Sequence, residues 1–231
     1  MYLHKLLTGA LSLLVMATLA PAAMLMPVSY DTPNGHGVAS SGSYNYWDLN
    51  YTGTGSTNTD NAALTGGLGD LTDGVIAGDN WINVENAAGT GPYVGWRHVV
   101  NPAPLVTFRF GSAVFLQSIT IYVDDSNGNG GVSPPASIDI GYEGGPYMNF
   151  LTPDPAGSAP TSYTFNGINL TNPSFDIRFN YANEWIFVSE VVFEGVRSRD
   201  ESGEVPEPST LTLIAGGFML LRLIRRKHAS V

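Results

Sequence analysis

The sequence predicts an all-β protein, an antiparallel two-sheet jelly-roll sandwich with an N-terminal signal helix and a short C-terminal hydrophobic helix. Apolar residues alternate with a period of two in several short segments, as strands buried on one face require. The 27 glycines and 15 prolines supply the turns between these segments. No amphipathic helical run of useful length and no internal repeat occurs. Because 43% of the 231 residues are apolar, the chain can still build a core.

The predicted strands follow one another along the middle of the chain. An early strand is expected at 44–51. Val106, Phe108 and Phe110 alternate before a turn at Gly111–Ser112. The remaining strands are expected at 118–123, 137–142, 161–165, 175–181 and 185–195, with a loop at 124–131. This spacing of strands and turns is typical of a sandwich.

The charge distribution excludes some partners. Half of the ten basic residues lie in the two ends, so the body keeps five arginines against 19 acidic residues, a formal net charge of −14. Such a surface repels nucleic acid and anionic lipid headgroups, and no nucleic-acid partner is expected. It suits divalent cations or neutral sugars, or it serves only solubility. Without cysteine, disulfides, zinc–thiolate sites and thiol catalysis are excluded.

The N-terminus has the layout of a signal peptide over residues 1–23. Lys5 precedes an apolar stretch, and Ala20-Pro21-Ala22 offers a cleavage site, so cleavage is expected after Ala22 or Ala23. The alternative is an uncleaved anchor. Residues 24–43 form a polar, turn-rich N-terminal arm that is either ordered or loose.

The C-terminus combines an acidic linker at 197–204 with a hydrophobic helix at 209–224 and a basic end. Its most apolar part, 211–224, spans about 21 Å as a helix, short of the roughly 30 Å hydrocarbon core. The segment therefore suits transient insertion into the inner membrane, with the basic residues staying cytoplasmic. A plain membrane anchor is the alternative.

Residues 205–231, with the triplet Pro206, Glu207 and Pro208, resemble the PEP-CTERM sorting signal of Gram-negative bacteria. The resemblance implies recognition of this triplet by an exosortase, a membrane protease, and removal of the hydrophobic tail. It also implies export to the cell surface or extracellular matrix, in bacteria that typically produce exopolysaccharide.

The body, residues 44–196, carries a second resemblance, which spans about residues 65–195. LGDLTDGVIAGDNW, GPYVGW, LVTFRFG, SITIYV and NEWIFVSEVVFEG occur in the order found in galactose-binding-like jelly rolls of the discoidin and coagulation-factor C type. Members of that family mostly bind glycans, glycoproteins or lipid headgroups, and few are catalytic. The resemblance implies a carbohydrate ligand here, and extracellular polysaccharide is the expected partner.

A possible calcium site lies early in the body. Asp70, Asp73 and Asp79 place three carboxylates within ten residues of a glycine-rich turn, and hard cations favour such oxygens. The resemblance joins Asp73 to Glu190 around structural calcium, with carbonyls near Val75, Gly78 and Ser189. The chain has Ala77-Gly78 where the family often has Thr or Ser. Alternatively, Asp73 forms an Asx turn and Glu190 accepts hydrogen bonds from backbone amides.

Sugar binding requires an exposed aromatic face and planar polar side chains. Trp81, Tyr93 and Arg97 lie in the predicted ligand loops and are the expected contacts. Trp96 and His98 share these loops, with Trp96 more often buried in such a context, and Trp47 and Trp185 are assigned to the core.

The rest of the sequence offers no signature of catalysis and no complete second calcium loop. A second oxygen-rich loop, at 124–129, lacks the calcium-loop glutamate and has Pro135 at that position, so it is predicted to be a solvated loop. No G-x-S-x-G motif occurs, and no acidic pair stands out for glycoside hydrolysis. The sequence therefore favours a non-catalytic binding protein. A secreted glycan-active enzyme and a structural adhesin without a small ligand remain the alternatives.

Overall fold

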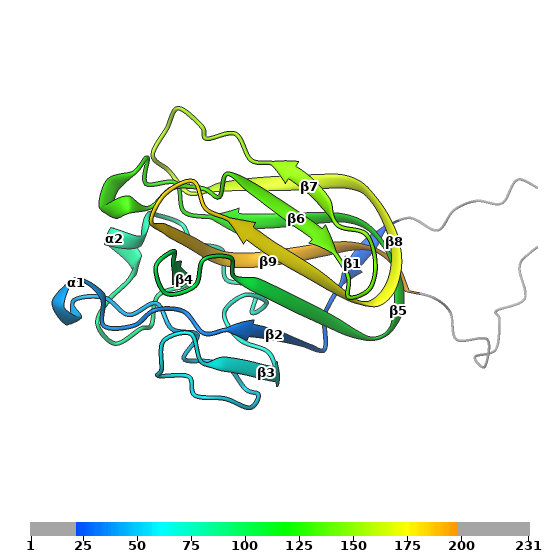
Figure 1. Cartoon of the computed structure of the whole chain (residues 1–231), viewed down its shortest axis with the longest axis horizontal. Helices are drawn as coiled ribbons and strands as arrows, with labels where there is room; N and C mark the ends of the chain where they lie inside the picture. Colours follow the sequence, from blue (N-terminus) through cyan, green and yellow to red (C-terminus); the bar gives the residue numbers. More distant parts are fainter. Residues whose placement is uncertain (1–21, 198–231) are drawn as a thin grey trace, which may run out of the picture. The chain divides into compact units, whose positions relative to one another are not determined.

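Residues 22–197 form an all-β body (Figure 1). The computed structural model describes these residues. The predictions for the signal helix, the sorting signal and its hydrophobic helix therefore lie outside the described residues, as does the acidic linker beyond Arg197. Among residues 22–197, no helix is long and apolar enough to cross a membrane.

Nine strands and three short helical turns make up the body. In chain order they are β1 (Ala23–Leu25), β2 (Ser29–Pro33), α1 (Ala39–Gly42), β3 (Ala63–Gly67), α2 (Trp81–Val84), β4 (Val94–Arg97), β5 (Leu105–Val123), the 3₁₀ turn η1 (Asn129–Gly131), β6 (Ser137–Gly141), β7 (Met148–Leu151), β8 (Thr161–Asn180) and β9 (Trp185–Arg197).

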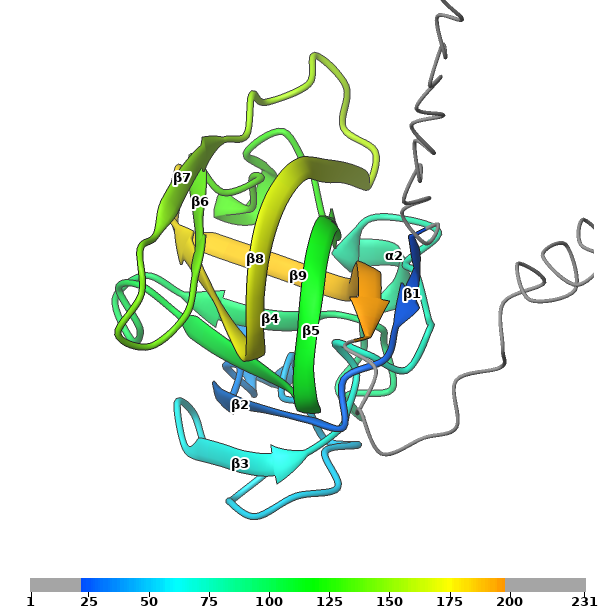
Figure 2. The same ribbon diagram turned by 90° about the vertical axis from the view of Figure 1, so that its right-hand side faces the viewer.

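Two antiparallel layers arise because β5 and β8 belong to both. The first half of β5 lies between β2 and the second half of β8, whereas its second half lies between β9 and the first half of β8. Sheet I therefore has the order β3-β2-β5-β8-β6-β7, and sheet II has β8-β5-β9 with β4 and β1 beside β9. Strand β8 curves strongly along its length (Figure 2). Strands that bend from one sheet into the next form the corners of a sandwich, as the sequence predicts.

The bend of β5 lies where the sequence predicts a turn. The pairing of β5 with β8 shifts register between Arg109 and Val114, and Gly111 has a φ of 74°. Glycine adopts this left-handed conformation without strain. The chain bends at Gly111 without reversing, so the prediction of a strand-ending turn at Gly111–Ser112 is wrong. In the same way, the strands expected at 161–165 and 175–181 are parts of the single strand β8.

Two other sequence predictions need correction at the start of the body. The segment 44–51 contains no strand, although Tyr46 and Tyr51 are buried. Side-chain hydrogen bonds hold this segment instead: Asp48 N–H donates to Asn34 Oδ1 at 2.9 Å. The arm at 24–43 is ordered, and β1 and β2 pair within the two sheets. The sandwich therefore begins at β1 and not at residue 44.

The main core fills the space between the layers. Phe193 of sheet II contacts Phe108 and Phe110 of β5, with ring centroids 4.8 and 5.2 Å apart. Trp96 of β4 stacks on Phe179 of β8 at 5.6 Å. Trp96 is thus buried between the layers and is not available to a ligand.

Candidate functional site

A second aromatic cluster closes one end of the sandwich, where α1, α2 and several connections gather on the left of Figure 1. Its large buried rings are Tyr46, Trp81, Tyr93, Trp185 and Phe187. Phe187 lies at the centre, with ring centroids 4.4 Å from Tyr46, 5.6 Å from Trp185 and 6.0 Å from Tyr93. The burial of Trp185 agrees with its assignment to the core, whereas Trp47 is only half-buried.

Two of the predicted sugar contacts are part of this cluster. Trp81 is 7% exposed and Tyr93 is 1% exposed, so the prediction that they present aromatic faces to solvent is wrong. The Tyr93 hydroxyl donates to the Asp79 carbonyl at 3.1 Å, and the backbone N–H of Trp81 donates to Asp124 Oδ2 at 2.6 Å. These bonds hold the two residues beneath the surface, where they support the loops above them.

Two buried carboxylates lie among the aromatic rings. Burial raises the pKa of Glu85 to about 8 and the pKa of Asp124 to about 6. Glu85 Oε1 accepts the Tyr93 N–H at 2.8 Å, while Glu85 Oε2 has no hydrogen-bond partner. Carboxylates buried without a basic partner resist ionisation, so this end of the sandwich is sensitive to pH.

The loop at 124–129 is solvated only in its second half. Asn127 and Asn129 are exposed as the sequence predicts, whereas Asp124 and Asp125 are fully buried. Ser126 donates its hydroxyl proton to Asp124 Oδ1 at 2.8 Å, and Asn80 donates to the Asp125 carbonyl at 3.1 Å. These polar residues therefore connect the loop to α2.

Trp185 of the aromatic cluster also borders a group of residues that we call the Arg97 cluster. It consists of the partly exposed polar side chains of Arg97, Glu184, His36 and Asp60 around the Trp185 ring, which is itself 8% exposed. The Arg97 guanidinium donates to Glu184 through Nε at 2.7 Å and also through an Nη, and it lies 5.6 Å over the Trp185 ring. His36 contacts the Trp185 ring edge-on, with ring centroids 5.3 Å apart, and its Nδ1 lies 2.7 Å from Asp60 Oδ2.

The Arg97 cluster depends on a close approach of the backbone after β2 to the backbone of β4. His36 N–H donates to the Gly95 carbonyl at 2.8 Å, which places the loop after β2 against β4. A Cβ at Gly35 would lie 2.0 Å from the Tyr46 carbonyl oxygen, so only glycine fits there. Asp60 is fixed in turn, because it accepts the Trp47 Nε1–H at 2.7 Å. The cluster is therefore preorganised, with exposed fractions of 38% for the Arg97 side chain and 41% for Glu184.

The predicted calcium ligands Asp73 and Glu190 lie on either side of a backbone contact. Glu190 Oε2 accepts the Gly74 N–H at 2.9 Å, which ties the early loop to β9. Asp73 Oδ1 accepts the Val75 N–H at 2.8 Å, an Asx turn. Burial raises the pKa of Glu190 to about 7, and the charge of Asp73 adds to this shift. Both hydrogen bonds are the ones expected if this loop binds no metal. The contact between the loop and β9 also brings the Asp73 and Glu190 carboxylates near each other.

Asp70 and Asp79 take up different surroundings. Asp70 is buried, its Oδ1 accepts Asn50 Nδ2–H at 2.8 Å, and its N–H donates to Asp48 Oδ1 at 3.1 Å. Burial and the neighbouring Asp48 charge raise the pKa of Asp70 to about 7. Asp79 is exposed and accepts the Asn80 N–H. Within residues 22–197, no three His, Asp or Glu side chains converge as a metal-ligand group.

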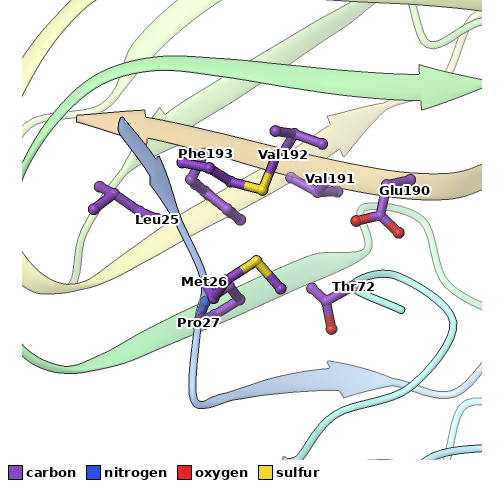
Figure 3. A pocket seen from close by; sticks show the side chains of 9 residues that line it. Leu25, Met26, Pro27, Thr72, Glu190, Val191, Val192 and Phe193 are labelled. Carbon is purple, nitrogen blue, oxygen red and sulfur yellow. The ribbon is translucent and has the colours of Figure 1, made fainter. Parts of the chain in front are cut away.

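A small cavity adjoins Glu190 between β1, β9 and the loop that contains Thr72. Figure 3 shows the Glu190 carboxylate pointing toward the gap between Met26 and Thr72. The cavity offers about 20 Å³ to the centre of a water-sized sphere. That is room for about one water molecule and too little for a sugar ring. The Arg97 cluster is therefore the better candidate for a ligand site.

Comparisons with known proteins identify the family. The model of the discoidin domain-containing receptor 1/2, DS-like domain, matches residues 27–195, and a PEP-CTERM protein-sorting motif matches residues 204–227. The chain therefore belongs to the family of DS-like domains, and it carries the sorting motif that Pro206, Glu207 and Pro208 indicate. A search of curated proteins finds no match.

Several solved structures are similar to parts of this chain. A CBM32 of AlyQ in complex with 4,5-unsaturated mannuronic acid is 14% identical, with 74% of this chain and 97% of that chain covered and a TM-score of 0.41. A fucolectin from striped bass (Morone saxatilis) serum is 16% identical, with 72% and 49% covered and a TM-score of 0.40. SpGH29 is 13% identical, with 56% of this chain covered and a TM-score of 0.36. The present chain spans about a quarter (24%) of the length of SpGH29.

Proposed function

We propose that this protein is an exported, non-catalytic carbohydrate-binding protein whose loop end contacts sugar through the Arg97 cluster. The observation that carries the proposal is the preorganised arrangement around Trp185. The Arg97 guanidinium lies over the indole and donates two hydrogen bonds to Glu184 Oε1, and His36, paired with Asp60, contacts the same indole ring. Such fixed planar groups match the alternating donors and acceptors of sugar hydroxyls.

Family membership and charge support the same proposal. The CBM32 of AlyQ and the fucolectin are, by their names, carbohydrate-binding proteins, and a sugar ligand is proposed here by analogy with them. The acidic body disfavours polyanionic partners. The expected ligand is therefore an extracellular polysaccharide that is neutral or weakly charged.

The sorting motif supports a route for the protein. We infer that an exosortase-type protease recognises Pro206, Glu207 and Pro208 after transient membrane insertion of the tail, and that the body then reaches the cell surface or matrix. Mass spectrometry of the mature protein tests this route. Loss of the residues after the triplet is the expected result, and an intact C-terminus on the mature protein contradicts it.

Calcium is proposed as a structural ion at Asp73 and Glu190. Its support is the contact between the loop and β9 at Gly74, which already brings the two carboxylates together. A cation there would offset the burial and the Asp73 charge that raise the pKa of Glu190, and it would hold the early loop on β9 more firmly.

Binding on an oligosaccharide array tests the main proposal. The full-length protein is purified in a detergent that contains no sugar and is compared with Arg97→Ala. Loss of one partner should weaken binding about tenfold or more, because Glu184 is left without its cation. Arg197→Ala is the matched control, since this arginine lies at the other end of β9 and donates to the Met26 carbonyl.

Two results would contradict the proposal. Absence of any bound sugar would favour the structural adhesin. Release of reducing ends from a polysaccharide would favour the glycan-active enzyme and would contradict the non-catalytic part of the proposal.

A further inference from the structure

The outer surface of sheet I carries polar side chains in register across neighbouring strands. We call this surface the outer face, and its central residues are Tyr147, Asn149, Asp139, Arg178, Asp176 and Thr107. It lies on a different surface from the Arg97 cluster, because its residues come from the strands of sheet I and from the β6–β7 connection, which contains Tyr147. Alternate side chains of a strand point to one face, so the strand register brings the other five residues together.

The register places them in two rows. In one row, Asn149 of β7 lies opposite Asp139 of β6, which lies opposite Arg178 of β8. In the next row, Asp176 of β8 lies opposite Thr107 of β5. Neighbouring strands are about 4.8 Å apart, so the surface from β7 to β2 is about 19 Å wide.

Hydrogen bonds fix the side chains within and between these rows. Asn149 Nδ2 donates to Asp139 Oδ1 at 2.6 Å, and Thr107 donates its hydroxyl proton to Asp176 Oδ1 at 2.6 Å. The Tyr147 hydroxyl donates to the other oxygen of Asp176. The polar groups are therefore held in one geometry before any ligand arrives, which lowers the entropic cost of binding.

Tyr147 supplies an aromatic platform beside this network. A Cβ at Gly141 would lie 2.8 Å from Tyr147 Cγ, so the absence of a side chain at Gly141 lets the ring lie against β6. The Arg178 guanidinium lies 5.2 Å from the ring centroid. Tyr147 remains 39% exposed and the nearby Leu151 is 78% exposed, so both present apolar surface to solvent on this face.

A groove continues the outer face at its other edge. It lies between β2, β3 and the start of β5, with a volume of about 380 Å³, and its lining includes Asp31, Pro33, Leu105 and Thr107. Asp31 and Thr107 are paired across β2 and β5, and Thr107 also belongs to the row of Asp176. The volume falls within the range of small-molecule sites. The groove and the rows thus form one continuous surface.

The side chains on this surface indicate which class of ligand it can bind. Amide, carboxylate, guanidinium and phenol groups dominate, and the large apolar side chains Tyr147, Leu151 and Leu105 are scattered among them, so a protein partner would find little contiguous apolar area to bury. Three carboxylates (Asp31, Asp139 and Asp176) stand against two guanidiniums (Arg109 and Arg178), which gives a polyanion no net attraction. Hydroxyl groups on a ring with an apolar face match both the polar rows and the aromatic platform.

We propose that the outer face is a second carbohydrate-binding surface, which holds an extended neutral oligosaccharide across β7, β6, β8 and β5 with one end in the groove. The proposal goes beyond the loop-end site, because the two surfaces share no residue. With both occupied, one molecule joins two polysaccharide chains and acts as a cross-linker of the matrix.

Calorimetric titration tests the second surface. The full-length protein in sugar-free detergent is titrated with cellohexaose, laminarihexaose, mannohexaose and β-1,4-galactohexaose. At least one of these should bind at two sites per chain. Tyr147→Ala and Arg178→Ala should each weaken the outer-face site about tenfold or more, whereas Tyr147→Phe keeps the ring and should stay within about threefold. Arg197→Ala is the control for charge, and the melting temperature of each variant reports whether it is folded.

The outcomes separate the two sites. Binding that is lost in Tyr147→Ala and kept in Arg97→Ala supports the outer face, whether or not the loop-end site binds. A single site that is lost in Arg97→Ala and unchanged in Tyr147→Ala overturns the outer face and leaves the proposed function intact. Absence of binding to all four hexasaccharides overturns the outer face as well. If Tyr147→Ala is not folded, the same comparison is made with Arg178→Ala.

Discussion

The loop end and the outer face of sheet I position polar groups in different ways. At the loop end, segments far apart in the chain are held by buried rings and by carboxylates without basic partners, such as Glu85. On the outer face, strand register places each side chain, and neighbouring carboxylates are paired with hydroxyl, amide or guanidinium groups. The loop end is therefore expected to depend on core packing and on pH, and the outer face on local sterics.

Truncation of the central ring should have the largest effect at the loop end. Phe187→Ala is expected to lower the free energy of unfolding by about 3–5 kcal/mol, because Phe187 is 1% exposed and contacts four other aromatic rings. Chemical denaturation measures this loss. Phe193→Ala in the main core should cost about as much, but in its folded fraction the loop-end affinity for sugar should be retained. Equal loss of that affinity in both variants would contradict the separation of the two regions.

The second largest effect concerns pH. The folded pKa of Glu85, about 8, lies above its ordinary value of 4.5, so the folded state binds the proton more tightly. The stabilisation by this proton is complete below pH of about 4.5 and is lost as the pH rises through about 8. Glu85→Gln should therefore raise the stability at pH 9 by roughly 2–4 kcal/mol and flatten the pH profile.

Thermal melts of the wild type and of Glu85→Gln from pH 4 to pH 9 measure this effect. An unchanged slope in the variant would show that Glu85 does not titrate during unfolding. Asp154→Asn, a substitution at an exposed carboxylate, is the control and should leave the slope as it is in the wild type.

A smaller effect is expected from calcium. If Asp73 and Glu190 hold calcium, a chelator should lower the melting temperature by about 3–6 °C, and Asp73→Ala should abolish this sensitivity. Asp154→Ala should keep it. An identical melting curve with and without chelator would leave the Asx turn and the Gly74–Glu190 hydrogen bond as the whole account of this loop.

The smallest expected effect belongs to the outer face. In Gly141→Ala, the new methyl group would lie 2.6 Å from the Pro146 carbonyl oxygen and 2.8 Å from the Tyr147 ring. We expect a destabilisation of about 1–2 kcal/mol and a displaced tyrosine. Calorimetry should then show weaker binding at the outer face with an unchanged loop-end site. Unchanged binding at both would contradict the role assigned to the platform.

The sequence predicts the sandwich well because its main signal, the alternation of buried residues, is local. Strands β5 and β6 follow that pattern closely, whereas β9 is buried on both faces along its first half. Within 44–51, Tyr46 and Tyr51 are buried without strand pairing, since Asn34 supplies a hydrogen bond that a neighbouring strand would otherwise provide. A glycine with positive φ occurs both in turns and in strand bends, and the sequence does not distinguish the two. The turn predicted at Gly111 is therefore the bend of β5.

The candidate site is less predictable because its groups come from distant segments. Arg97 is predicted, but its partner Glu184 lies 87 residues further along the chain. Trp81 and Tyr93 are in the expected loops, yet only the fold shows that Phe187 and Asp124 hold them below the surface. His36 and His98 stand out in the sequence as the body's histidines, but nothing local pairs His36 with Asp60.

Amide chemical shifts in the Tyr147→Ala background test the central claim, sugar binding at the loop end, most directly. The isotope-labelled variant is titrated with the oligosaccharide that binds best on the array. We predict shifts at the amides of His36, Arg97 and Glu184, which are absent when Arg97→Ala is added. Saturable binding that leaves these three amides unchanged would contradict the account.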